Sequence, residues 1–249
     1  MKALTEMDKI SLKARVSVSA NVRLWWLGPT AGIFCSVVVF LFSSGIAGLA
    51  MVQCEPDGDV QFVCGPVSPE DLSYIPQSHW VVASSMEEEG YLSAVDVRDH
   101  NSIVLFPTEA ACSRHDAATY PLCPDMLTDQ FRPHGVGLRL GNNGVHTLYV
   151  VRHGAREAIE VFQLDLDGAA PSLTWVGGAV APEVLGLNAV VPLAEGGFAV
   201  TSPRTSDVWE WHTGTGWEIV PGSEDIGPNG LEISRDGRWL FVAGYRGQS

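Results

Sequence analysis

Short apolar stretches separated by polar turns dominate the chain after residue 55. Four of them are strongly hydrophobic, at 80–83, 148–151, 197–200 and 240–243. The first three are each followed, after a turn, by a second stretch, at 91–97, 159–165 and 208–212, the last leading on to 217–220. Short stretches of this kind, bounded by Gly, Asn, Asp and Pro, are typical of antiparallel strands and not of helices. The pattern therefore predicts an all-β fold.

A polar residue recurs just before each of the four hydrophobic strands. The residues are Glu70, His134, Asn188 and Asn229. Each is followed by a small or acidic residue, then an apolar one, then a turn into the hydrophobic strand. A strand–turn–strand unit repeated at about 40–50 residues is typical of β-propeller blades. The longer first interval is explained by a cysteine-bearing insertion at about 100–131. We predict four blades within residues 53–249.

The repeat also predicts a site. The innermost strand of every propeller blade lines a central channel, so equivalent residues point at one axis from different directions. Glu70, Asn188 and Asn229 would bring a carboxylate and two amide oxygens together, which suits a hard cation such as calcium. His134 is a poor calcium ligand and is better suited to act as a base. Asn-Gly alone is more often a turn, but four equivalent polar residues on channel strands are costly without a function.

The first 52 residues differ from the rest. Residues 33–52 are almost unbrokenly apolar and follow a stretch with five basic residues. This predicts a membrane anchor at 30–52 with residues 1–29 in the cytoplasm. The alternative is a cleaved signal peptide, with Gly48-Leu49-Ala50 as the cleavage site. Both interpretations place residues 53–249 outside the cytoplasm, in a periplasmic, luminal or extracellular compartment, anchored or secreted.

Charge and cysteine spacing add further constraints. From residue 53 onward the chain has 10 arginines and 27 acidic residues, a formal charge of −17. So acidic a surface repels phosphate backbones, which argues against nucleic-acid binding. Four cysteines form two local pairs, Cys54/Cys64 and Cys112/Cys123, in a compartment that permits disulfides. We predict two local bridges, Cys112–Cys123 and Cys54–Cys64, and favour Cys112–Cys123 of the two.

Five motifs carry a family resemblance, at 68–72, 133–136, 148–153, 187–191 and 228–231. In their order and spacing they resemble the motifs of the paraoxonase/arylesterase family, over residues 64–249. More distantly the chain is similar to gluconolactonases and strictosidine synthase-like propellers. The family is a six-bladed propeller that hydrolyses lactones and aryl esters with calcium. The resemblance therefore implies the same fold and a small ester or lactone substrate.

The resemblance also assigns roles to residues. It implies that Glu70, Asn188 and Asn229 hold the catalytic calcium, and that His134 and His153 form a histidine pair that activates water. It further implies a second calcium held by Asp71 and the carbonyl of Val136, although Ala189 replaces the carboxylate expected there. The family's other calcium ligands belong to a blade beyond Ser249, so we expect a truncated product with about four blades.

Two functions from different classes follow. The first is a calcium-dependent hydrolase of aryl esters or lactones, and the alternative is a non-catalytic propeller that binds a protein or ligand at the cell surface. Propellers host many functions, so the fold alone does not decide between them. A strictosidine synthase-like condensing enzyme is disfavoured by the Glu70, Asn188 and Asn229 set. The sequence has no Gly-x-Ser-x-Gly elbow and no zinc-ligand spacing, which argues against a serine hydrolase and a zinc enzyme.

Overall fold

The computed structural model describes residues 54–245, and the regular structure in this range is entirely β. The predicted all-β fold is thus confirmed for this part of the chain. The predicted helix at 30–52 lies outside the described residues. Within residues 54–245, no helix of the length and apolar character needed to cross a bilayer is found.

The strands form four sheets in chain order. The first sheet contains β1 (Pro69–Tyr74), β2 (Trp80–Ser85), β3 (Leu92–Asp96) and β4 (Asn101–Phe106). The second contains β6 (Phe131–Arg139), β7 (Val145–Gly154), β8 (Ala158–Asp165) and β9 (Ser172–Val180), with β5 (Cys112–Ser113) parallel to β9. The third contains β10 (Val190–Pro192), β11 (Phe198–Ser202), β12 (Asp207–His212) and β13 (Gly216–Ile219). The fourth contains β14 (Pro228–Ile233) and β15 (Leu240–Gly244).

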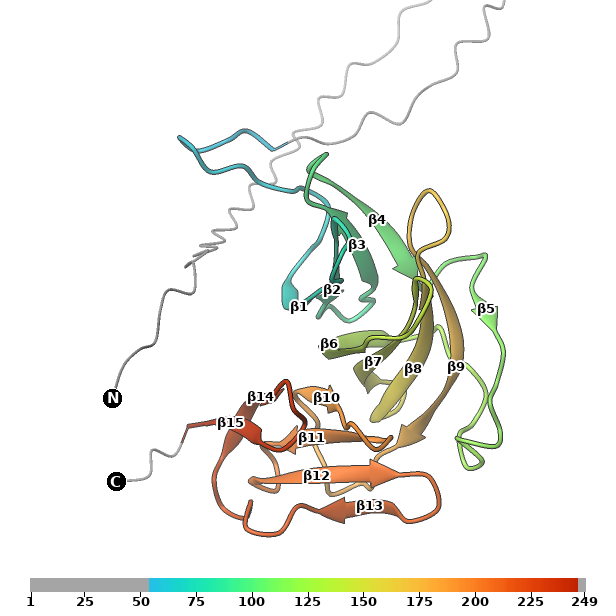
Figure 1. Cartoon of the computed structure of the whole chain (residues 1–249), viewed down its shortest axis with the longest axis vertical. Helices are drawn as coiled ribbons and strands as arrows, with labels where there is room; N and C mark the ends of the chain where they lie inside the picture. The colour runs from blue at the N-terminus through green and yellow to red at the C-terminus, as the bar shows by residue number, and fades with distance from the viewer. Residues whose placement is uncertain (1–53, 246–249) are drawn as a thin grey trace, which may run out of the picture. The chain divides into compact units, whose positions relative to one another are not determined.

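The four sheets fan out from a common centre, and the first strand of each meander, β1, β6, β10 or β14, lies innermost (Figure 1). Neighbouring inner strands contact each other in the order β1, β6, β10, β14. This is the arrangement that the four-unit repeat predicts, and it is consistent with consecutive blades of a β-propeller. The six-bladed type stays a prediction.

Three inner strands carry an irregularity at the same place in the repeat. The register shifts between Pro69 and Leu72 in β1, between Pro133 and Val136 in β6, and between Pro228 and Leu231 in β14. Glu70, His134 and Asn229 therefore each sit in a bulge directly after a proline. A bulge disrupts the ladder locally and can aim a side chain away from the regular alternation. Three of the four repeat-equivalent residues thus occupy equivalent bulges, whereas Asn188 lies two residues before β10 (Val190–Pro192).

Apolar layers between neighbouring sheets hold the fan together. Phe106 of the first sheet meets Phe162 of the second with ring centroids 4.9 Å apart. Tyr149 of the second sheet meets Phe198 of the third at 5.6 Å. Val242 of the fourth sheet packs against the cluster formed by the third. Face-to-face burial of this kind fixes the angle between sheets and so positions the inner strands.

A buried ionic cluster fastens the insertion to the second sheet. Glu160 lies 3.3 Å from the Nη1 atom of Arg152, and it accepts bonds of 2.7 and 2.8 Å from Arg156 and of 2.7 Å from Trp175 Nε1. Arg152 is fully buried and Glu160 is 2% exposed. Arg152 also donates to the carbonyl of Asp129 at 2.6 Å. The insertion is therefore held through its backbone by Arg152 of β7, which in turn pairs with Glu160 of β8.

The predicted Cys54–Cys64 bridge is confirmed, and the predicted Cys112–Cys123 bridge is wrong. Cys54 and Cys64 are bonded, whereas Cys112 and Cys123 carry free thiols. Cys112 pairs with Thr174 of β9, whereas Cys123 lies against the backbone of Gly178, four residues further along the same strand. Four strand residues span about 13 Å. A bridge needs Cα atoms within about 7 Å. Burial raises the pKa of the Cys123 thiol to about 11, so it is poorly suited to react as a thiolate.

Candidate functional site

Three of the four repeat-equivalent residues meet at one atom. The Nε2 atom of His134 lies 3.1 Å from Oε1 of Glu70 and 3.3 Å from Nδ2 of Asn188. Glu70 lies on β1 of the first sheet and His134 on β6 of the second, while Asn188 lies two residues before β10 of the third. The His134 side chain is mostly buried, with 11% of it exposed, whereas 37% of the Glu70 side chain is exposed. The group is therefore reached by solvent from the Glu70 side.

Close backbone contact between the second and third sheets positions His134 and Asn188. The N–H of Gly135 donates to the carbonyl of Asn188 at 3.1 Å. A Cβ atom at position 135 would collide with that carbonyl, so the residue after His134 has to be glycine. On the other side, the N–H of Asn188 donates to the carbonyl of Thr201 at 3.0 Å. These bonds hold the main chain beside both functional side chains.

His153 lies directly behind His134. Its Nε2 atom is 3.0 Å from Nδ1 of His134, and its own Nδ1 atom is 2.8 Å from Oε2 of Glu157. The structure thus joins the two histidines that the family resemblance implies as a pair. Glu157 was missed by the sequence reasoning because it lies in a turn and has no counterpart in the repeat. The feature of the sequence that could have indicated Glu157 was its position four residues after His153.

Asn229 is tied to the same region through its backbone. Its carbonyl accepts a 2.6 Å bond from the hydroxyl of Thr201, whose oxygen in turn accepts the N–H of Ala189 at 3.0 Å. The side-chain amide of Asn229 donates to the hydroxyl of Tyr245 at 2.7 Å. The fourth repeat position therefore lies on the neighbouring strand, with its amide bonded to Tyr245 and not to His134.

The two residues implied for a second calcium bond to each other. The N–H of Val136 donates to Oδ2 of Asp71 at 2.8 Å, and the N–H of Leu72 donates to Oδ1 at the same distance. Burial raises the pKa of the Asp71 carboxyl above its usual range. Asp71 thus links β1 to β6, and a second ion bound here stays a prediction.

The donor set of the main group fits calcium in kind. Glu70 provides a carboxylate, while Asn188 and Asn229 provide amide oxygens on adjacent segments, and calcium in proteins takes oxygen ligands of these types. Within residues 54–245, no three His, Cys, Asp or Glu side chains gather as a metal cluster. A site made of one carboxylate and two amides has only one anionic ligand, so weak affinity is expected.

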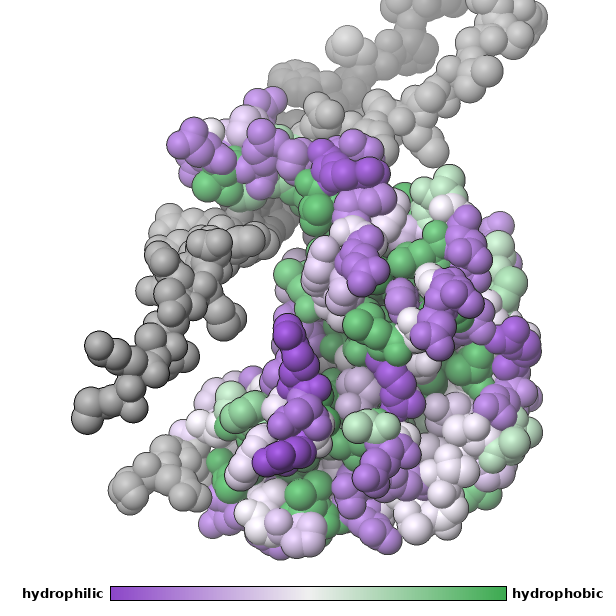
Figure 2. Space-filling view, viewed as in Figure 1, coloured by the Kyte–Doolittle hydropathy of each residue, from purple (hydrophilic) through white to green (hydrophobic). Residues whose placement is uncertain are grey.

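A pocket of about 400 Å³ lies between the four inner strands. Its lining includes Asp71 and Ala189, which directly follow Glu70 and Asn188 in the sequence, and Val136 of β6. The face of the molecule seen in Figure 2 shows hydrophilic and hydrophobic residues interspersed. The pocket is thus lined by the strands that carry the candidate residues, although Glu70, His134 and Asn188 do not themselves line it.

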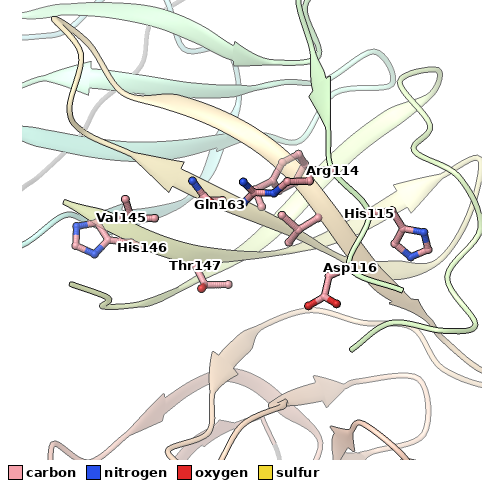
Figure 3. Close-up of a pocket in the computed structure, with 9 residues that line it drawn as sticks. Arg114, His115, Asp116, Val145, His146, Thr147 and Gln163 are labelled. Atoms are coloured by element: carbon pink, nitrogen blue, oxygen red, sulfur yellow. Dashed lines mark hydrogen bonds between the residues drawn. The ribbon is translucent and has the colours of Figure 1, made fainter. Parts of the chain in front are cut away.

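A second pocket, of about 450 Å³, lies against β7 and β8 (Figure 3). Arg114 donates to Gln163, His115 bonds to the carbonyl of Tyr120 at 3.1 Å, and Nδ1 of His146 accepts the N–H of Gly141 at 3.1 Å. In Figure 3, His146 and His115 lie at opposite ends of the group. Its polar side chains are thus spread apart, whereas Glu70, His134 and Asn188 face one another.

Comparison with known proteins gives only distant similarities. No protein-family model and no curated protein matches the chain. A gluconolactonase from Xanthomonas campestris is similar in structure, with 13% identity and a TM-score of 0.48, over 76% of this chain and 61% of that one. A streptogramin B lyase has 16% identity and a TM-score of 0.40, over 74% and 64%. A putative oxidoreductase of the glucose dehydrogenase type from Thermus thermophilus has 14% identity and a TM-score of 0.41, over 72% of this chain and 58% of that one. The chain spans about three fifths of the length of these proteins, and identities this low transfer no residue roles.

Proposed function

We propose that this protein is a calcium-dependent hydrolase of lactones or aryl esters, built on a propeller of the six-bladed type. The observation that carries the proposal is the meeting of Glu70 and Asn188 at Nε2 of His134, with His153 bonded behind. A ring nitrogen that faces both a carboxylate and an amide is an arrangement suited to move a proton.

In this proposal the ligand residues and the two histidines have separate roles. Glu70, Asn188 and Asn229 would hold the calcium, which when bound polarises the substrate carbonyl and stabilises the developing negative charge. His134 takes a proton from the attacking water as the oxygen bonds to the carbonyl carbon. It then returns the proton to the leaving oxygen as the ester C–O bond breaks. His153 orients the His134 ring through the 3.0 Å bond.

The predicted location agrees with such a role. With residues 30–52 as an anchor or a cleaved signal, this domain would act on small esters outside the cytoplasm, and its formal charge of −17 disfavours polyanionic substrates. A neutral lactone or aryl ester has no such penalty. The proposal therefore names a small uncharged substrate.

Chelation tests the proposal on the full-length chain. We expect hydrolysis of phenyl acetate, or of a member of a γ- and δ-lactone panel, to fall to background with EGTA and to return with added calcium but not with magnesium. Hydrolysis that persists in EGTA would refute the calcium requirement. Absence of hydrolysis over the whole panel with calcium present would favour the non-catalytic binding module instead.

A further inference from the structure

A third pocket, of about 400 Å³ and largely apolar, lies where the insertion meets the third sheet. The loop after β5 reaches the turn of the β12–β13 hairpin (Figure 1), where the hydroxyl of Thr213 donates to the carbonyl of Thr119 at 3.2 Å. The end of β9 forms another side, and Trp217 Nε1 donates to the carbonyl of Val180 there at 2.9 Å. Three segments that are far apart in the sequence are thus joined around one cavity.

Stacked aromatic rings support the wall of this pocket. Trp211 stacks on Tyr120 with ring centroids 5.4 Å apart and on Phe198 at 5.3 Å, with interplanar angles of 19° and 9°. Trp217 packs edge-on against Phe198 at 5.6 Å. The Tyr120 ring lies so close to Gly177 that a Cβ atom at that position would be 2.6 Å from it. The rings are therefore held in place before any ligand binds, which lowers the cost of ordering them.

The lining of this pocket carries no ionised acid or base. Among the described residues that line it, none is Asp, Glu, Lys or Arg, whereas the pocket in Figure 3 includes Arg114 and the pocket between the inner strands includes Asp71. The indole N–H of Trp217 is already bonded to the main chain. A charged group placed in this cavity would lose water and gain no partner of opposite charge, which is costly. The lining therefore favours an uncharged molecule.

Apolar side chains of the lining are still open to solvent. Leu122 is 93% exposed, and Trp217 is half-buried. A molecule that covers these two side chains removes apolar surface from water, which favours binding. The volume of the cavity is near the lower end of the range for ligand sites in proteins. It therefore suits a molecule of one or two fused rings.

We propose that this pocket binds a small, uncharged, planar aromatic molecule, which packs against Trp217 and Leu122. A rigid ring loses little conformational freedom on binding, and stacking on an indole adds to the gain from burial. The site is independent of the proposed hydrolase function, because none of its lining residues is a proposed calcium ligand or base.

Fluorine NMR titration of the full-length chain with 5-fluoroindole tests the proposal, and 5-fluoroindole-2-carboxylate is the charged comparison. We expect 5-fluoroindole to bind with a Kd below about 1 mM, as for other ligands of about ten non-hydrogen atoms. The carboxylate should bind at least tenfold more weakly, because the lining offers it no cation. Equal Kd values for the two probes, or no binding of 5-fluoroindole, would overturn the proposal.

Trp217→Ala removes the ring on which the probe is expected to stack, and should raise the Kd of 5-fluoroindole at least tenfold. Trp239→Ala is the matched control, because Trp239 is 62% exposed and lies outside the pocket. It should leave the Kd unchanged within about twofold. Equal Kd values for the two folded variants would place the probe elsewhere and overturn the assignment.

The two free thiols locate the probe in the wild-type chain, and so decide the matter if Trp217→Ala does not fold. Cys123 lines the pocket, whereas Cys112 is exposed outside it. With the probe at about ten times its Kd, alkylation of Cys123 by iodoacetamide at alkaline pH should slow at least fivefold, and that of Cys112 by less than twofold. Peptide mass spectrometry measures both rates. An unchanged rate at Cys123 would overturn the proposal, and so would a Cys123 that never reacts, because the cavity would then be closed to small molecules.

Discussion

Replacing His134 by glutamine is expected to lower kcat/KM for ester or lactone hydrolysis by about 10²–10⁴-fold, the range that general acid–base groups contribute. Glutamine keeps hydrogen-bonding atoms in the channel but cannot take a proton from water. Calcium affinity should stay within about threefold of wild type, because His134 is not one of the proposed ligands. Initial rates and calorimetric calcium titrations on the same preparations measure both quantities.

His212→Gln is the matched control for this change. His212 lies at the end of β12, and its imidazole is 3.6 Å from Glu210. Its replacement should leave kcat/KM unchanged within about twofold. An activity of His134→Gln equal to that of the control would show that His134 is not the base.

The largest expected effect on stability is that of Glu160→Gln, which should lower the free energy of unfolding by about 3–5 kcal/mol, as for other buried ion pairs broken on one side. The change removes the charge that Arg152 and Arg156 share in the interior, and Arg152 has no exposed surface. It also places an NH₂ group among donors, including Nε1 of Trp175. Urea unfolding followed by circular dichroism measures the loss.

An exposed pair provides the comparison. Asp236 and Arg238 are 3.7 Å apart, with 56% and 74% of their side chains exposed. Asp236→Asn should therefore change the free energy of unfolding by at most about 1 kcal/mol. Equal effects of Glu160→Gln and Asp236→Asn would contradict the view that the buried cluster fastens the insertion to the second sheet.

The repeat predicted which strands line the centre, and three of the four residues that it expected to converge lie together. Equivalent residues of successive sheets share an axis, so Glu70, His134 and Asn188 could be placed together without coordinates. The direction of the Asn229 amide could not be predicted, because a bulge aims the side chain by local backbone geometry. The shared proline before Glu70, His134 and Asn229 was the sequence signal for these bulges.

Contacts between distant segments were beyond the sequence. The Cys112–Cys123 pair has suitable spacing, but pairing of β5 with β9 separates the two residues by several strand positions. Glu157 lies in a turn, and its partner Leu187 belongs to another sheet 30 residues later. Neither contact recurs at a regular interval along the chain, so no pattern in the sequence could have predicted it.

Calcium titration by calorimetry tests the central claim most directly, on the full-length wild type, Glu70→Gln and the control Glu183→Gln. Glu70 is the only anionic member of the proposed ligand set, whereas Glu183 is exposed on a segment outside it. The account predicts weak binding to the wild type and to Glu183→Gln, and at least tenfold weaker binding to Glu70→Gln, about 1.4 kcal/mol. Equal calcium affinity in all three chains would place the ion elsewhere and contradict the assignment of this site.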